Sequence, residues 1–197
     1  TFAWSFGDGG SSTANNVVYT YTTSGTYSSS LVATNEGGCT ASSGIAVTVN
    51  SNPVISGTQS VCVGFTTTLS SASTGGTWSS GSANATVGAG TGIVTGVSAG
   101  TANITYTLPT GCFSFVTVTV NGNPAAIGGG PMAVCVGLNT TLTDATAGGS
   151  WTSGNTTQAT VVSGTGVVTG ISAGTPYITY TLPTGCYATQ QITVNPN

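Results

Sequence analysis

Alternating apolar and polar residues are the clearest pattern along the chain. Residues 104–108 read ITYTL and residues 116–120 read VTVTV, so every second side chain is apolar in both stretches. A period of two, with many β-branched and aromatic residues, is typical of half-buried β-strands. Glycine-rich steps separate such stretches, and no segment carries the apolar spacing of an amphipathic helix. The pattern therefore predicts an all-β protein of short antiparallel strands.

The pattern is also repeated. Residues 51–121 align almost throughout with residues 122–195, and both contain VCVG early and YTLPTGC late. The cysteine of VCVG recurs after 73 residues, as Cys62 and Cys135, and the tryptophan between the two motifs recurs after the same interval. Self-similarity at a fixed interval indicates duplicated modules.

A tryptophan followed 34 or 35 residues later by a cysteine occurs three times. Two occurrences lie in the repeats, and the third, Trp4 with Cys39, lies before them. Short strands at this spacing favour a small antiparallel β-sandwich for each module. We therefore expect three modules: residues 1–50, whose N-terminal part we expect to be missing, residues 51–121 and residues 122–197.

The charges of the chain exclude two classes of partner. There is no Lys, Arg or His, and the charged side chains are Asp8, Glu36 and Asp144, for a net charge of −3. A nucleic-acid-binding protein needs cations to displace counterions from phosphates, and binding to an anionic membrane surface needs them as well. Ser, Thr and Gly interrupt every apolar run before it reaches the ~18 residues of a membrane-spanning helix. We expect no nucleic-acid partner and no membrane insertion.

The same composition leaves little catalytic chemistry. A serine nucleophile needs an adjacent base, and neither His nor Lys is present to act as one. Asp8 and Glu36 share the first module, but we interpret both as solvated loop residues rather than as a catalytic carboxylate pair. Asp8 lies between Gly7 and Gly9 and fits a turn better than a calcium site, which prefers several carboxylates. We predict that the protein is not an enzyme and has no catalytic residue, cofactor or metal site.

The three tryptophans permit two interpretations. A tryptophan at one fixed place in each module indicates a core residue, packed as in immunoglobulin domains. We therefore assign Trp4, Trp78 and Trp151 to the cores of their modules. The alternative is an exposed platform on which a sugar ring stacks.

The two repeats resemble the bacterial immunoglobulin-like domains of group 2. The residues that carry the resemblance are GTWSS at 76–80 and GIVTGVSAGT at 92–101, with Trp151 and GVVTGISAGT at 166–175 in the second copy. The resemblance extends over residues 51–195. It implies tandem immunoglobulin-like β-sandwiches of the kind found on bacterial surface proteins and adhesins.

The first module is similar to a different family, the PKD domain. The matching segments are WSFGDG at 4–9, YTY at 19–21, GTY at 25–27 and LVATN at 31–35. The resemblance implies another β-sandwich, used as an extracellular spacer or interaction module. Ser5 stands where the family often has Asp or Asn, so we transfer no ion-binding site.

Four of the five cysteines occupy equivalent places in the two repeats. Cys62 and Cys112 are 50 residues apart, and Cys135 and Cys186 are 51 residues apart. We therefore predict two disulfides, Cys62–Cys112 and Cys135–Cys186, each inside one module. Paired cysteines indicate an oxidising compartment, so we expect an extracellular or bacterial cell-surface location.

The fifth cysteine, Cys39, stands where the later cysteine of each repeat stands. By analogy its partner would lie upstream of Thr1, in a longer parent chain. The alternative is a free buried thiol.

The sequence favours a structural function. Natural β-proteins guard exposed sheet edges with charges, and this chain has almost none, so its modules suit packing against one another. Proline in the junctions at residues 50–53 and 121–124 restricts hinge motion, which predicts a rod. We expect a spacer or fibre component of a secreted or cell-surface repeat protein, cut from a longer polypeptide, whose partners are neighbouring copies or adjacent modules. The alternatives are an adhesin that binds a glycan or a surface protein, and accessory modules of a secreted hydrolase.

Overall fold

A computed structural model describes residues 1–197, which form strands, turns and bends and no helix. The all-β fold class that the alternating pattern predicts is therefore confirmed. The chain divides into two compact units. The first comprises Thr1–Val54, Ser71–Thr77 and Tyr106–Ser114, and the second comprises Ile55–Ser70, Trp78–Thr105 and Phe115–Asn197. We keep the names first, second and third module for residues 1–50, 51–121 and 122–197.

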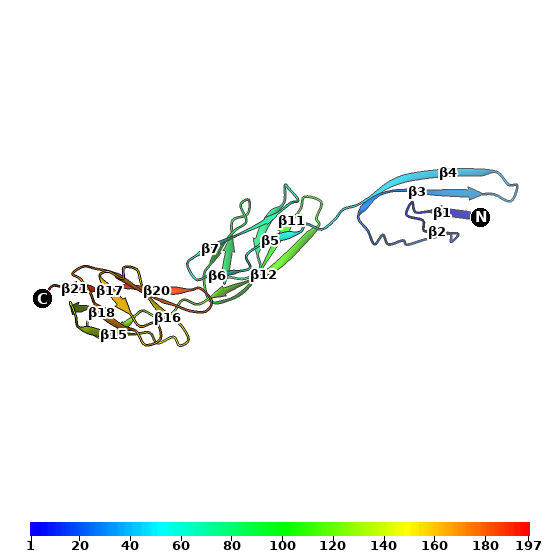
Figure 1. The fold of residues 1–197 in the computed structure, drawn as a ribbon. Helices are drawn as coiled ribbons and strands as arrows, with labels where there is room; N and C mark the ends of the chain where they lie inside the picture. The colour runs from blue at the N-terminus through cyan, green and yellow to red at the C-terminus, as the bar shows by residue number, and fades with distance from the viewer. The chain divides into compact units, whose positions relative to one another are not determined.

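The first module is a four-stranded antiparallel sheet in the order β2-β1-β3-β4 (Figure 1). Its two long strands pair over their whole length, from Gly25 opposite Val49 to Thr34 opposite Thr40. Phe6, which follows the first strand, is buried, whereas most of the last strand is exposed. The strands are β1 (Phe2–Ser5), β2 (Ser11–Ser12), β3 (Gly25–Thr34) and β4 (Thr40–Val49).

The second module has two four-stranded sheets, β5-β7-β10-β9 and β6-β12-β11-β8. The alternating stretches at 104–107 and 116–120 fall on the two longest of these strands, as their period of two predicts, and Leu108 directly follows the first of them. The strands are β5 (Ile55–Gly57), β6 (Ser60–Cys62), β7 (Thr66–Ser71), β8 (Thr77–Ser80), β9 (Ala85–Val87), β10 (Ile93–Gly96), β11 (Gly100–Thr107) and β12 (Phe113–Asn121).

The third module repeats this arrangement, with the sheet β13-β15-β18-β17 and the sheets β16-β19-β20 and β14-β21 (Figure 1). β20 and β21 together correspond to β12, and the break between them falls at Ile192, whose N–H donates to the carbonyl of Pro176. The strands are β13 (Gly128–Gly129), β14 (Ala133–Cys135), β15 (Asn139–Thr143), β16 (Ser150–Ser153), β17 (Ala159–Val161), β18 (Val167–Gly170), β19 (Tyr177–Thr181), β20 (Tyr187–Gln191) and β21 (Thr193–Asn195).

Each repeat contains one parallel pair of strands, where the alternation alone predicts antiparallel pairing throughout. β6 pairs parallel with β12, and β14 pairs parallel with β21. The reason is that the chain pairs with one sheet in β5 and then crosses to the other sheet in β6. Gly57 ends β5 with a φ of +124°, and a Cβ there would lie 2.5 Å from the carbonyl oxygen of Thr68, so only glycine fits this close approach.

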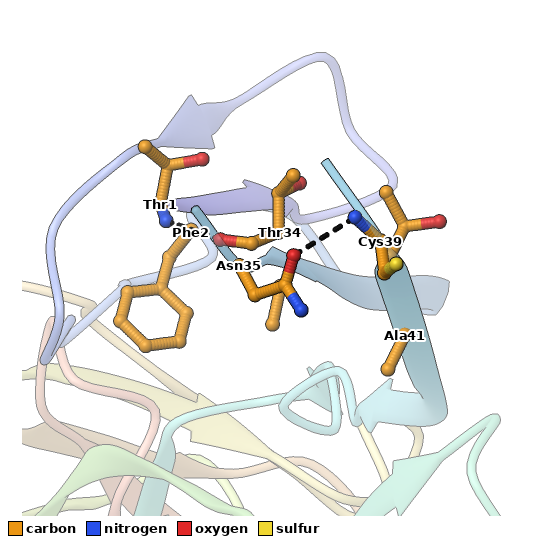
Figure 2. Close-up of a pocket in the computed structure, with 8 residues that line it drawn as sticks. Thr1, Phe2, Thr34, Asn35, Cys39 and Ala41 are labelled. Carbon is orange, nitrogen blue, oxygen red and sulfur yellow. Dashed lines mark hydrogen bonds between the residues drawn. The ribbon is translucent and has the colours of Figure 1, made fainter. Parts of the chain in front are cut away.

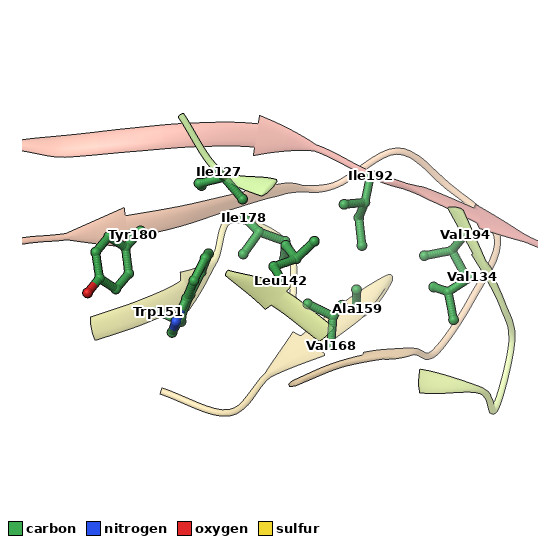
Figure 3. Close-up of a cluster of buried hydrophobic side chains, with 10 residues drawn as sticks. All are labelled: Ile127, Val134, Leu142, Trp151, Ala159, Val168, Ile178, Tyr180, Ile192 and Val194. Carbon is green, nitrogen blue, oxygen red and sulfur yellow. The ribbon is translucent and has the colours of Figure 1, made fainter. Parts of the chain in front are cut away.

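The core of the third module joins its two layers (Figure 3). Leu142, Ala159 and Val168 come from one sheet and lie against side chains from the other. In Figure 3, Trp151 and Tyr180 lie at one end of the cluster, with Val134 and Val194 at the other. The cluster comprises Ile127, Val134, Leu142, Trp151, Ala159, Val168, Ile178, Tyr180, Ile192 and Val194.

Candidate functional site

A cysteine ends the same five-residue turn in all three modules. In the third module the turn joins β19 to β20. The N–H of Leu182 donates to the carbonyl of Cys186 at 2.8 Å, and the N–H of Gly185 donates to the carbonyl of Leu182 at 2.9 Å. Gly185 has a φ of +86°, a conformation that favours glycine. The same bonds and a positive φ recur in the turns that end at Cys112 and Cys39. We call these three residues the hairpin cysteines.

A second kind of cysteine ends a short strand in each repeat. Cys62 ends β6 and pairs with Asn121 at the end of β12, and Cys135 ends β14 and pairs with Asn195 at the end of β21. After each of them the N–H three residues further on donates to the cysteine carbonyl at 3.0 Å. We call these two residues the strand cysteines.

The two kinds of cysteine lie at opposite ends of a module. Cys186 directly precedes β20, whereas Cys135 lies opposite Asn195, nine residues further along the chain. Nine residues of strand span roughly 30 Å, but the two Cα atoms of a disulfide lie within about 7 Å of each other. A Cys135–Cys186 bond therefore cannot form inside the third module.

The predicted pairing is accordingly wrong. In the second module Cys112 directly precedes β12 and Cys62 pairs with its last residue, so a Cys62–Cys112 bond is excluded for the same reason. Cys112, Cys135 and Cys39 are free thiols. Equal spacing in the sequence showed that the cysteines are equivalent, but it did not show at which end of a strand each one lies.

The disulfide in the structure is Cys62–Cys186, which joins the second module to the third. The two Cα atoms are 5.6 Å apart and the bond closes a loop of 124 residues. The Cys186 side chain is fully buried, and its Sγ lies 3.9 Å from the carbonyl oxygen of Asn121. A strand cysteine of one module is thus bonded to the hairpin cysteine of the next.

Further contacts surround this joint. The side-chain amide of Asn123, in the connecting segment, donates to the carbonyl of Val63 at 3.0 Å. The rings of Phe65 and Tyr187 meet with their centroids 5.6 Å apart. A hollow of about 300 Å³ lies beside the bond. Its lining residues are Thr58, Ser60, Val61, Cys62, Phe65, Thr66, Thr67, Gly185 and Tyr187.

Cys112 has the same setting without a partner. Its Sγ lies 3.9 Å from the carbonyl oxygen of Asn50, which follows the last strand of the first module. Asn121, which contacts Cys186 in the same way, ends the last strand of the second module. The one cysteine within residues 1–50 is the hairpin residue Cys39.

Cys39 lies at the rim of a hollow of about 400 Å³ in the first module (Figure 2). The side-chain oxygen of Asn35 accepts a hydrogen bond from the N–H of Cys39 at 2.9 Å and holds the turn in place. Thr1 closes the opposite side, and its amino group donates to the carbonyl of Thr34 at 2.6 Å. The lining is mostly apolar and comprises Thr1, Phe2, Ala33, Thr34, Asn35, Cys39, Thr40 and Ala41.

Asp8 is held in a turn and bonded to a cluster of aromatic rings. Its Oδ1 accepts from the N–H of Gly10 at 2.9 Å, and its Oδ2 accepts from the hydroxyl of Tyr19 at 2.8 Å. The hydrogen bond from the Gly10 N–H is the main cause that lowers the pKa of Asp8. Desolvation raises this pKa in part, and the bond from the Tyr19 hydroxyl lowers it further. The same bond to Asp8 raises the pKa of Tyr19. The ring of Tyr19 stacks on Phe6 with a centroid distance of 3.8 Å.

The other two carboxylates lie in separate places. Glu36 is exposed in the hairpin turn of the first module. Asp144 belongs to the third module, where its Oδ1 accepts from the N–H of Thr146 at 2.7 Å and its Oδ2 is buried without a hydrogen-bond partner. No group of three or more His, Cys, Asp or Glu side chains is arranged to hold a metal ion.

The three tryptophans differ in their surroundings. Trp78 and Trp151 are buried, and the ring of Trp151 lies 4.7 Å from that of Tyr180. Trp4 is only half-buried, and its indole N–H donates to the carbonyl of Ala14 at 3.0 Å.

The chain has no helix of the length and apolar character that crossing a membrane requires.

Residues 1–49 match the PKD domain family, which confirms the resemblance of the first module. No curated protein sequence matches the chain.

Solved structures that are similar to the chain include a surface layer protein and intimin. Domains 1–6 of the surface layer protein SbsC are 20% identical, with a TM-score of 0.35 over 86% of this chain and 32% of that one. A C-terminal 282-residue fragment of intimin, in complex with the intimin-binding domain of the translocated intimin receptor, is 15% identical, with a TM-score of 0.38 over 87% of this chain and 58% of that one.

A third similar structure is the protein SGBP-B of a mixed-linkage glucan utilization locus of Bacteroides ovatus, in complex with a mixed-linkage heptasaccharide. It is 18% identical, with a TM-score of 0.29, and the match covers this whole chain and 60% of that protein. The chain therefore spans between about a third and three fifths of the length of these three solved chains.

Sequence reasoning did not identify Phe65 and Tyr187, whose rings meet beside the Cys62–Cys186 bond. A signal for the joint was present, because the hairpin cysteines follow a turn motif, TGC or GGC, whereas the strand cysteines sit in VCVG. Two different motifs place the cysteines in two different kinds of local structure.

Proposed function

We propose that the chain is a structural segment of a secreted or cell-surface repeat protein, in which linked β modules act as a spacer or as a fibre component. The observation that carries the proposal is the Cys62–Cys186 bond, since it ties one repeat to the next outside the backbone. The bond also supports an extracellular location, because disulfides persist in oxidising compartments.

The bond changes how the chain carries tension. A pull on the two ends passes along the backbone to Cys62, crosses to Cys186 and continues to the C-terminus. Residues 63–185 lie outside this path, so most of both repeats is relieved of the load. Such an arrangement suits a protein that holds two points at a fixed separation.

Pulling single molecules by their ends tests this function. With the bond intact, the loop of 124 residues stays closed, and complete unfolding yields a chain that is shorter by roughly 400 Å than after reduction. A Cys186→Ser variant should give the longer extension with and without reductant. Equal extensions of the native chain under both conditions would contradict a role in carrying tension.

Other features support the same proposal. Stability in a repeat array is approximately a sum over modules and their interfaces, and the sheets of residues 51–121 recur in the same order in residues 122–197. We propose these two segments and residues 1–50 as the modules of the spacer. The scarcity of charge leaves edge strands unguarded against pairing with other modules.

A second candidate is adhesion through a glycan. The hollow beside the joint has the half-exposed rings of Phe65 and Tyr187 and the hydroxyls of Ser60, Thr66 and Thr67 on its walls. Aromatic faces with a few polar groups suit a small ligand. Titration with a panel of oligosaccharides, using Phe65→Ala and the exposed Phe115→Ala as a matched pair, tests this role. Binding of a sugar that is lost in Phe65→Ala and kept in Phe115→Ala would support this role. Absence of binding to every sugar in the panel would reject it.

A further inference from the structure

The free cysteines of the chain are of two complementary kinds. Cys135 is a strand cysteine without a hairpin partner, and Cys39 is a hairpin cysteine without a strand partner. The joint between the repeats shows how the two kinds combine, because Cys62 and Cys186 are equivalent to them and are bonded.

We propose that copies of this chain join end to end through a disulfide between Cys135 of one copy and Cys39 of the next. This inference rests on the proposed structural function and names a second copy of the chain as its partner. The new bond would repeat the Cys62–Cys186 joint.

The surroundings of Cys135 match those of Cys62. Both cysteines pair with the asparagine that ends the last strand of their module, at Asn195 and Asn121. The residue three positions after each cysteine is apolar. At the existing joint it is Phe65, which meets the ring of Tyr187, and after Cys135 it is Leu138, whose side chain is 60% exposed. Leu138 is thus placed to meet a module that carries a hairpin cysteine.

The surroundings of Cys39 supply the receiving side. The turn that ends at Cys39 has the hydrogen bonds of the turn that ends at Cys186, and the thiol is exposed. The hollow of about 400 Å³ beside it is lined by the apolar side chains of Phe2, Ala33 and Ala41 (Figure 2). An exposed apolar side chain such as Leu138 suits a hollow of this lining.

Cys112 is the weaker choice of partner, although its turn is the same. Its thiol already lies against the carbonyl of Asn50, so the end of the first module occupies the position that an incoming module would need. Cys39, in contrast, is exposed.

The bond forms by exchange with a low-molecular-weight disulfide such as oxidised glutathione. The thiolate of one cysteine attacks the glutathione disulfide and releases one glutathione thiolate. The thiolate of the other cysteine then attacks the mixed disulfide, forms the Cys39–Cys135 bond and releases the second glutathione. The two cysteines lose two protons and two electrons, and the glutathione disulfide gains them.

The test uses the full chain at increasing concentration in a buffer of reduced and oxidised glutathione. Non-reducing electrophoresis should show a ladder of multimers that grows with concentration, and mass spectrometry of chymotryptic peptides should find Cys39 bonded to Cys135. Cys39→Ser and Cys135→Ser should each remain monomeric, whereas Cys112→Ser should form the native ladder. Retention of the Cys62–Cys186 peptide shows that each variant is folded.

Mixing the two inactive variants makes the test specific. Cys39→Ser keeps the strand thiol and Cys135→Ser keeps the hairpin thiol, so an equimolar mixture should give dimers and nothing larger. Multimers of Cys135→Ser alone, a ladder linked through Cys112, or no ladder from the native chain would each overturn the proposal. If one of these results is obtained and the pulling experiment still gives the shorter extension with the Cys62–Cys186 bond intact, only the end-to-end bond is rejected. The proposed structural function is then retained.

Discussion

The hydroxyl of Tyr180 donates a hydrogen bond to the carbonyl oxygen of Thr146 at 2.7 Å. The same hydroxyl accepts from the N–H of Gly149 at 2.8 Å, so one side chain on β19 fastens both ends of the turn that precedes β16. In the second module the hydroxyl of Tyr106 makes the equivalent pair of bonds, to Ser73 and Gly76.

Removing this hydroxyl should destabilise the third module. We expect Tyr180→Phe to lower the free energy of unfolding by about 1–3 kcal/mol, because it leaves a partly buried N–H and carbonyl without their partner. Urea denaturation measures the effect. Tyr177→Phe is the matched control, since Tyr177 lies on the same strand with a side chain that is 55% exposed. Equal stability of the two variants would show that the Tyr180 bonds contribute nothing.

Breaking the joint should cost more than removing a free thiol. On the chain-entropy model, opening a loop of 124 residues by Cys186→Ser lowers the free energy of unfolding by about 5 kcal/mol. Cys112→Ser, at the equivalent position of the second module, should have little effect because its thiol is free.

A thiol count under denaturing conditions checks the pairing directly. The native chain should react at its three free cysteines, and Cys186→Ser should react at four because Cys62 is released. A count of one in the native chain would instead support the two bonds inside the modules.

The core of the third module should respond to a cavity. Leu142 is 1% exposed, and Leu142→Ala should cost about 2–5 kcal/mol, the range for large-to-small core substitutions. The matched control is Leu138→Ala, which removes the same atoms from a side chain that is 60% exposed and should change the stability little. Urea denaturation measures the free energy of unfolding of both variants. An equal decrease in the two would contradict the predicted contribution of Leu142 to the core.

The acid stability of the first module should depend on Tyr19. The pKa of Asp8 in the folded chain is below its ordinary value of 3.8. The hydrogen bonds to its carboxylate therefore stabilise the fold above that pH and are lost as the pH falls through the lowered pKa.

Tyr19→Phe removes the hydroxyl that donates to Asp8 and leaves the N–H of Gly10 in place. The pKa of Asp8 should therefore rise towards 3.8 but stay below that value because of the Gly10 bond. An NMR titration of the Asp8 carboxyl carbon measures the change. Tyr177→Phe, in the third module, should leave the pKa of Asp8 as it is. An unchanged value in Tyr19→Phe would show that the hydroxyl does not contribute.

Local structure was largely readable from the sequence. The period of two at residues 104–108 and 116–120 predicted strands that are present in β11 and β12. The repeated motifs predicted that residues 51–121 and 122–195 share one architecture, and the order of their sheets agrees. These features follow from side chains next to each other in the chain.

The pairing of the cysteines was not readable in the same way. Whether Cys62 meets Cys112 or Cys186 depends on which end of a strand each residue occupies and on how one module follows another. The parallel register of β6 against β12 determines at which end of the strand Cys62 lies, and this register depends on residues far apart in the sequence. Trp4 lies as many residues before Cys39 as Trp151 lies before Cys186, yet Trp4 is only half-buried. The residues packed around a tryptophan decide its burial, and its distance from the cysteine in the sequence does not.

The Cys62–Cys186 bond also changes what a single cut in the backbone can do. A protease that cleaves once anywhere in residues 63–185 leaves both fragments covalently attached, because the bond spans the cut. The strands on either side of the nick remain paired within their sheets. Release of a fragment requires a second cleavage or a reductant, so the two repeats keep their connection after damage that would sever an unbridged chain.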